Sequence, residues 1–386
     1  MIKQKKLCVL ASFDSFIKAS VPIVDIFRKN GHEISIFVVK FDHHERYIKL
    51  YNQDVSVIDS YIDPGFVKEA LNSNYLMISL AGGSIRQLVS HLSDKLTLPK
   101  RPLIFAGYCG LVYEKQLIGA TSRINLDVYY VNSKNDYNLF NKYFEDLDVD
   151  SNVYLTGLPL FDKYASTPRR DPGAKGIVFA AQPTVPWHRK HREYTLKNFI
   201  ELAKAYPQYH FYFKPRGNPK EKTFHTEEYY YQDLLNDYKE ELPANFEMTE
   251  TKIQELFKKS FLCISVSSTA LIEAHLMGLK TAVLIDYGIE QQLGNHYFNG
   301  SGSYTNFKKL KENIHHLNND ESWFKNNLEI SGNNTQRLYE IVTELEPEVS
   351  MAPIRNYQPF YDFDLRPFKR KVTDKLKRIL KRKSVH

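Results

Sequence analysis

The sequence predicts an α/β fold made of two doubly wound, parallel sheets. Short apolar runs alternate with helical patterns over residues 7–159, and the alternation restarts at residue 177, after a stretch that contains Pro168, Pro172 and Gly173. Such alternation favours parallel strands joined by crossover helices. The length of 386 residues fits two domains of about 150–200 residues each.

The expected strands are short runs rich in β-branched and aromatic residues. In the first half they span residues 7–12, 33–39, 55–59, 75–81, 102–107, 127–132 and 153–159, with a helix over 15–29. In the second half strands are expected over 177–182, 210–216, 246–249, 261–266 and 281–287, and helices over 190–206, 227–240, 251–259 and 270–277. Both halves therefore alternate strand and helix.

These ranges divide the chain into five parts. An N-terminal Rossmann-like domain is expected over residues 1–163, a linker over 164–176 and a C-terminal Rossmann-like domain over 177–350. A return segment (351–366) and a basic tail (367–386) follow. Ligands of such sheets bind outside the carboxyl ends of the strands, so a site is expected where these ends of the two domains face each other.

Composition and charge exclude several classes of protein. The three cysteines, Cys8, Cys109 and Cys263, lack metal or disulfide spacing, which favours reduced thiols and a cytoplasmic protein. No 18-residue apolar run occurs, so no transmembrane helix is expected, and the residues from Met1 to Phe13 do not predict a signal peptide. Residues 365–386 hold ten Lys/Arg and one Asp, whereas the other 364 residues hold 42 basic and 44 acidic side chains. This near-neutral body argues against a nucleic-acid binder.

The stretch 261–278 is the unit around which the second half is organised. A buried strand is followed by Ser267, Ser268 and Thr269, which are residue types that begin helices, and Gly278 is expected to end the helix. Hydroxyls and free N–H groups at such a turn favour an anion. Glu273 lies one turn inside the helix, where it could reach a ribose. An ordinary capped helix is the alternative interpretation.

Polar side chains follow two further strands of the second half. Gln182, Pro183 and Arg189 come after the first strand, and Lys214 and Arg216, with His225 further on, come after the second. Because these strand ends are expected to converge with the hydroxyl turn, they predict a phosphate site with arginine forks and a lysine point charge.

A base would have to come from the first domain. Asp14 follows the first strand and Glu114 lies beyond the fifth, so both are candidates. Asp14 is also a plausible N-cap for the helix that follows it. Asp127 begins a strand, which places it at the wrong end of the sheet.

The stretch from Gln182 to Leu235 resembles a group of bacterial glycosyltransferases, and the strong match covers about residues 177–278. The shared pattern consists of Gln182, Pro183, Val185, Pro186, Arg189, Arg192, Lys214, Arg216, Thr223, His225 and Glu227, and the hydroxyl turn with Glu273 also fits. The resemblance implies a GT-B fold, with an acceptor domain, then a nucleotide-sugar domain. It also implies a CMP-activated nonulosonic acid (pseudaminic or sialic type) as donor and a capsule or lipopolysaccharide acceptor. The chain lacks the His-Pro dipeptide that better-known bacterial sialyltransferases place at the CMP phosphate, and His225 could stand in for it.

Three alternatives remain open at this point. A nucleotide-sugar epimerase or a polyol-phosphate transferase could use the same fold, and a non-catalytic nucleotide-sugar binder could serve as a partner in polysaccharide assembly. No Asp-x-Asp pair stands at an expected strand end, so no obligatory metal or other cofactor is expected.

The tail over residues 367–386 is expected to form a basic amphipathic helix. Its apolar stripe consists of Phe368, Val372, Leu376, Ile379 and Leu380, and its other faces are mostly Lys and Arg. Such a helix is typical of a segment that lies on an anionic membrane, here the cytoplasmic face of a bacterial plasma membrane, close to a lipid-linked acceptor. A helix packed on the N-terminal domain is the alternative.

Overall fold

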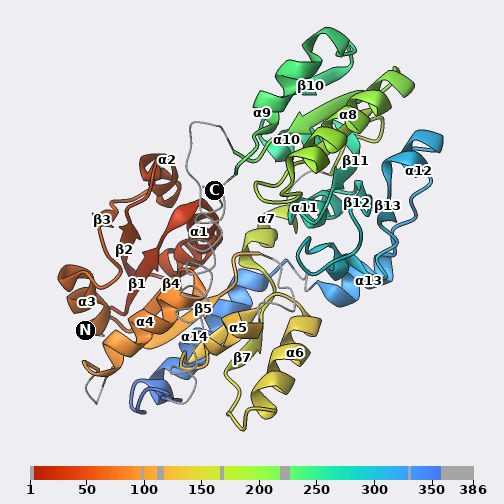
Figure 1. Cartoon of the computed structure of the whole chain (residues 1–386). Helices are drawn as coiled ribbons and strands as arrows, with labels where there is room; N and C mark the ends of the chain where they lie inside the picture. Colours follow the sequence, from red (N-terminus) through yellow and green to blue (C-terminus); the bar gives the residue numbers. More distant parts are fainter. Residues whose placement is uncertain are drawn as a thin grey trace, which may run out of the picture.

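The computed structural model describes residues 4–96, 100–110, 117–165, 169–217, 227–328 and 332–357 (Figure 1). Three predictions therefore lie outside the described residues: the candidate base Glu114, the candidate phosphate ligand His225 and the basic tail 367–386. The two sheets occupy separate halves of the molecule, with α7 (Asp162–Ala165) between them (Figure 1).

In the described part of the chain, the first sheet has seven parallel strands in the order β3-β2-β1-β4-β5-β6-β7. They are β1 (Lys6–Ala11), β2 (Glu33–Val39), β3 (Ser56–Ile58), β4 (Tyr75–Ser79), β5 (Leu103–Gly107), β6 (Val128–Val131) and β7 (Val153–Leu155). The strand order reverses between β1 and β4, which are neighbours in the sheet. β4, β5 and β6 are buried along their whole length, as expected of parallel strands covered on both faces.

Short helices connect these strands. They are α1 (Phe13–Lys29), α2 (His44–Ile48), η1 (Lys49–Tyr51), α3 (Pro64–Leu71), α4 (Gly82–Ser93), α5 (Leu117–Thr121), α6 (Lys134–Glu145) and η3 (Pro159–Phe161). Helix α1 begins earlier than predicted, with Ser12 as its N-cap residue, so Asp14 lies inside its first turn. The prediction of Asp14 as an N-cap is therefore wrong, and its carboxylate does not cap the start of α1.

The second sheet has six strands among the described residues, in the order β10-β9-β8-β11-β12-β13. They are β8 (Gly176–Ala180), β9 (His210–Lys214), β10 (Phe246–Met248), β11 (Ser260–Ser265), β12 (Lys280–Leu284) and β13 (Tyr304–Thr305). The helices are α8 (Arg189–Ala205), α9 (Tyr231–Leu234), η4 (Leu235–Glu241), α10 (Ile253–Lys258), α11 (Ala270–Leu276), η5 (Asn295–Phe298), α12 (Phe307–Glu312) and α13 (Glu321–Asn327). The order reverses at β8 and β11, which are neighbours.

The last described helix, α14 (Asn334–Val349), returns to the first domain (Figure 1). Its Leu338 and Val342 belong to the apolar core that also contains Phe27 and Phe105. Its Glu346 accepts a hydrogen bond from Lys5 at 2.6 Å. The predicted domain boundary at residue 350 places α14 in the second domain, whereas in the structure α14 packs against the core of the first domain.

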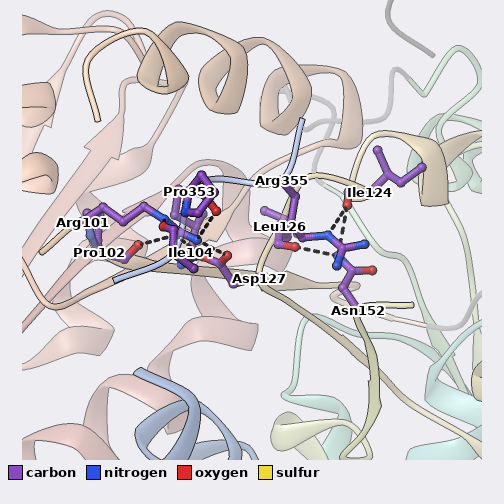
Figure 2. Close-up of polar contacts among 10 residues, drawn as sticks. Arg101, Pro102, Ile104, Ile124, Leu126, Asp127, Asn152, Pro353 and Arg355 are labelled. Carbon is purple, nitrogen blue, oxygen red and sulfur yellow. Dashed lines mark hydrogen bonds and ion pairs between the residues drawn. The ribbon is translucent and has the colours of Figure 1, made fainter. Parts of the chain in front are cut away.

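Residues 350–357 continue along the first domain, as Figure 2 shows. Arg101 pairs with both carboxylate oxygens of Asp127 at 2.8 Å and also donates to the carbonyl of Pro353, and Arg355 donates to the carbonyl of Ile124. Asp127 directly precedes β6 and is buried. The interpretation that Asp127 lies at the wrong end of the sheet is therefore confirmed: it is part of a structural ion pair at the amino edge.

Among the described residues, no helix is both long enough and apolar enough to cross a membrane. Cys8, Cys109 and Cys263 carry free thiols.

Candidate functional site

The carboxyl ends of β8 and β11 meet where the second sheet reverses its strand order. The side-chain oxygen of Gln182 accepts a hydrogen bond from the Ser267 backbone N–H at 2.9 Å, and its amide nitrogen donates to the Ser267 hydroxyl at 3.1 Å. The Ser267 hydroxyl also donates to the carbonyl of Leu293. Gln182 and Ser267 were predicted to contact the donor, but these contacts employ their side chains to join two loops. These hydrogen bonds hold the turn against the loop after β8, and donor contact by Gln182 and Ser267 stays a prediction.

The loop after β8 is built around a buried arginine. Arg192 is 1% exposed, and its guanidinium donates to the carbonyls of Gln182, Pro183, Pro186 and Tyr229 and pairs with Glu227 at 2.6 Å. Burial raises the pKa of Glu227 to about 6, although the charge and hydrogen bond of Arg192 oppose the rise. Pro183, a predicted donor residue, contributes a carbonyl to this network. The matching pattern in the sequence thus includes residues that shape the loop.

Arg189, also a predicted donor residue, lies on the surface of α8. Its Nε pairs with Glu193 at 2.7 Å on the same helix, and its side chain is 57% exposed. Within the described residues it makes no ion pair with a group of the hydroxyl turn or of the loop after β9.

Two cations at the carboxyl end of β9, Lys214 in its last position and Arg216 just beyond it, lie at the junction of the domains. Arg216 Nη2 lies 3.3 Å from the carboxylate of Asp14 and 3.3 Å from the hydroxyl of Ser15, both in the first turn of α1. Lys18 pairs with the same carboxylate at 3.0 Å. The carboxyl edges of the two sheets thus face each other, and a predicted phosphate ligand meets a predicted base.

The charges of both domains act on these groups. Burial alone would raise the pKa of Asp14, but Arg216 and Lys18, with hydrogen bonds from Lys18 and Ser15, hold it below its ordinary value. Burial lowers the pKa of Lys214, and the positive charges of Arg216, Arg46 and Lys18 lower it further, against the attraction of Glu250.

We call Lys18, Arg46, Lys214 and Arg216 the cation cluster. Two members come from the first domain and two from the second. Like charges gathered in this way repel one another, and a bound anion relieves the repulsion. The arrangement is therefore suited to an anionic ligand held by both domains.

The hydroxyl turn itself stays partly open. Ser268 and Thr269 are half-buried. The hydroxyl oxygen of Ser268 accepts from the N–H of Ala270, and Thr269 makes no side-chain cap to α11. A Cβ built on Gly110 of the first domain would lie 3.5 Å from the Thr269 hydroxyl, so this turn also faces the domain junction.

Glu273 is where the sequence places it, one turn inside α11. Its carboxylate accepts hydrogen bonds from the hydroxyl of Tyr164, in α7, and from the amide of Gln254. A ribose at this position would have to share the carboxylate with Tyr164. Gly278 ends the helix with φ of +83°, a backbone conformation that favours glycine, as predicted.

Sequence reasoning missed Lys18, Arg46 and Tyr164. Lys18 had a usable signal, because it stands four residues after Asp14, one helical turn away. Arg46 and Tyr164 had none, since only the packing of the two domains brings them to the site. Among the described residues no group of three His, Cys, Asp or Glu side chains is arranged to hold a metal ion.

These features define a GT-B protein: two doubly wound parallel domains whose carboxyl edges face each other. Residues 7–344 match the model of the family described as "Putative glycosyltransferase (DUF6716)", and the chain belongs to this family. No curated protein matches the chain by sequence.

Solved structures show the same fold at low sequence identity. The UDP-GlcNAc 2-epimerase of Neisseria meningitidis, bound to UDP-GlcNAc, is 14% identical with a TM-score of 0.57, over 88% of this chain and 100% of that chain. The UDP-GlcNAc 2-epimerase of Methanocaldococcus jannaschii, in complex with UDP-GlcNAc and UDP, is 12% identical with a TM-score of 0.58, over 88% and 99%. MurG of Acinetobacter baumannii is 10% identical with a TM-score of 0.53, over 88% and 99%.

Proposed function

We propose that this protein transfers a nonulosonic acid, of the pseudaminic or sialic type, from a CMP-activated donor to a capsule or lipopolysaccharide acceptor. The observation that carries the proposal is the contact of Arg216 with Asp14 across the domain junction, with Lys214 and the hydroxyl turn near first-domain residues at the same junction. The nucleotide sugars bound to two structures of the same fold support a nucleotide-sugar donor. The CMP and the nonulosonic acid rest on the sequence pattern from Gln182 to Glu227.

Each group has a task in this reaction. Lys214 and Arg216 stabilise the negative charge that grows on the phosphate oxygen as the bond from sugar to phosphate breaks. Ser268 and Thr269 offer hydroxyl donors to the same phosphate, and Glu273 accepts from the ribose. Asp14 takes the proton of the acceptor hydroxyl. In this proposal no obligatory metal takes part.

A nucleotide-sugar 2-epimerase is the second candidate, favoured by the likeness of the fold to two UDP-GlcNAc 2-epimerases. Thermal-shift measurements with CMP, CDP, UDP and GDP separate the two. A selective shift with CMP supports the transferase, and a selective shift with UDP supports the epimerase. Donor turnover then distinguishes either enzyme from a non-catalytic binding partner.

Replacing Arg216 by Ala is expected to weaken CMP binding by at least about 1.5 kcal/mol, the scale of a charge-assisted hydrogen bond. Isothermal titration calorimetry measures the change. Arg189→Ala is a matched control, because it removes an arginine that pairs only with its own helix in the described structure, and it should leave the affinity unchanged. Equal CMP affinity in wild type and Arg216→Ala would remove Arg216 from the phosphate site.

The tail is proposed to hold the enzyme on the cytoplasmic face of the membrane. Residues 367–386 carry nine Lys/Arg over 369–383, and each such residue near an anionic surface contributes about 1 kcal/mol. Deleting 367–386 should abolish sedimentation with anionic liposomes at low salt and leave turnover of small acceptors intact. If the full-length protein does not sediment with such liposomes, the tail has another role.

A further inference from the structure

The predicted phosphate ligand and the predicted base are partners in the ligand-free protein. Arg216 holds Asp14 through a single nitrogen at 3.3 Å, and the Arg216 side chain is 50% exposed. A contact of this length and exposure is weak. The phosphodiester of a CMP-sugar carries one negative charge, as a carboxylate does, but its two unesterified oxygens can accept parallel hydrogen bonds from the Arg216 guanidinium, whereas Asp14 meets only one nitrogen. Arg216 is therefore placed to exchange one anion for the other.

Asp14 is much less exposed than its partner, at 15%. Lys18 and Ser15 contact it from α1, Arg216 contacts it from the loop after β9, and Cys109 approaches it from the end of β5. Burial raises the pKa of the Cys109 thiol to about 11, so this neighbour is neutral near pH 7. Two cations therefore face the carboxylate, and a carboxylate so paired is a poor acceptor of protons.

We propose that the phosphate of the donor displaces Asp14 from Arg216, so that this carboxylate becomes an effective base only when the donor is bound. The proposal rests on the function proposed above. Lys18 stays on the same helix as Asp14 and keeps the carboxylate in place after Arg216 has left. The site is thus idle without donor and is activated by donor binding itself.

The transfer then uses Asp14 as the base. The acceptor hydroxyl oxygen forms a bond to the anomeric carbon while its proton passes to the carboxylate of Asp14. The bond between that carbon and the phosphate oxygen breaks, and its electron pair leaves with CMP. When CMP departs, Arg216 returns to Asp14, which favours loss of the proton to water and restores the starting state.

The test is the titration of Asp14 in the full-length protein labelled with ¹³C-aspartate, followed by NMR with and without saturating CMP. The resonance that Asp14→Asn removes identifies the group. CMP should move the titration midpoint of Asp14 upward, by an amount similar to that caused by Arg216→Ala without CMP. In the Arg216→Ala variant, saturating CMP should change the titration midpoint of Asp14 only slightly.

Two outcomes would overturn the exchange. One is CMP binding to the wild type with no upward movement of the midpoint. The other is an equal movement by CMP in wild type and Arg216→Ala, because the phosphate charge would then act on Asp14 directly. Lys18→Ala is the control for a cation that does not exchange. In this variant the titration midpoint of Asp14 without CMP should be higher than in wild type, and CMP should raise it further. Absence of any CMP binding would instead refute the proposed donor. The titration midpoint of Asp14 in Arg216→Ala, measured without CMP, would still show whether Arg216 lowers the pKa of Asp14.

Discussion

Replacing Asp14 by Asn is expected to lower turnover by about 10²–10⁴, the usual contribution of a general base. Asn fills the same space but cannot take the proton of the acceptor hydroxyl. It also removes the carboxylate that competes for Arg216, so CMP should bind as tightly as in wild type or more tightly. Steady-state kinetics with saturating donor, together with calorimetry of CMP binding, measure the two effects.

The combination of lost turnover and retained affinity is what identifies a base. Glu114→Gln is the comparison, since Glu114 is the other candidate that follows a strand of the first domain. Wild-type turnover in Asp14→Asn, with a large loss in Glu114→Gln, would move the role to Glu114. Weaker CMP binding in Asp14→Asn would contradict the competition between Asp14 and phosphate.

All strands of both sheets except the two-residue edge strand β13 could be predicted, because parallel strands are covered on both faces. Stretches such as residues 102–107 and 177–182 are continuous apolar runs, and each coincides with a strand to within two residues, β5 and β8. The helix over 227–240 was predicted less well. It consists of a single turn, α9, followed by the 3-10 helix η4. Apolar spacing alone does not separate these two forms.

The candidate site could be predicted only in part. The sequence identifies which strand ends carry cations and hydroxyls, and the structure places Lys214, Arg216 and the hydroxyl turn at the domain junction. The sequence could not show that Gln182 and Ser267 hydrogen-bond to each other, because both residue types are equally suited to binding a ligand. Nor could it show the contact between Arg216 and Asp14, which are 202 residues apart in the chain.

Arg192 illustrates how a residue in a functional pattern can act through stability. Replacing it by Ala should lower the free energy of unfolding by about 3–5 kcal/mol, the cost of leaving one partner of a buried ion pair alone. Four carbonyl groups and the carboxylate of Glu227 would lose their donor. Urea unfolding followed by circular dichroism measures the loss in the second domain.

The pH dependence of this loss separates the ion pair from simple packing. The pKa of Glu227 is about 6 in the folded protein, above the ordinary value of 4.5. The folded state therefore binds this proton more tightly than the unfolded state, and stability falls as pH rises through this range. Without Arg192 the buried carboxylate loses its counter-charge, so the deficit of Arg192→Ala should be smaller at pH 5 than at pH 8. Adding Glu227→Gln should recover part of this deficit at pH 8.

Arg189→Ala, which breaks an exposed pair on the same helix, should change the free energy of unfolding by less than about 0.5 kcal/mol. A pH-independent deficit, or one that Glu227→Gln does not reduce, would show that the arginine acts through its carbonyl contacts and not through the buried carboxylate.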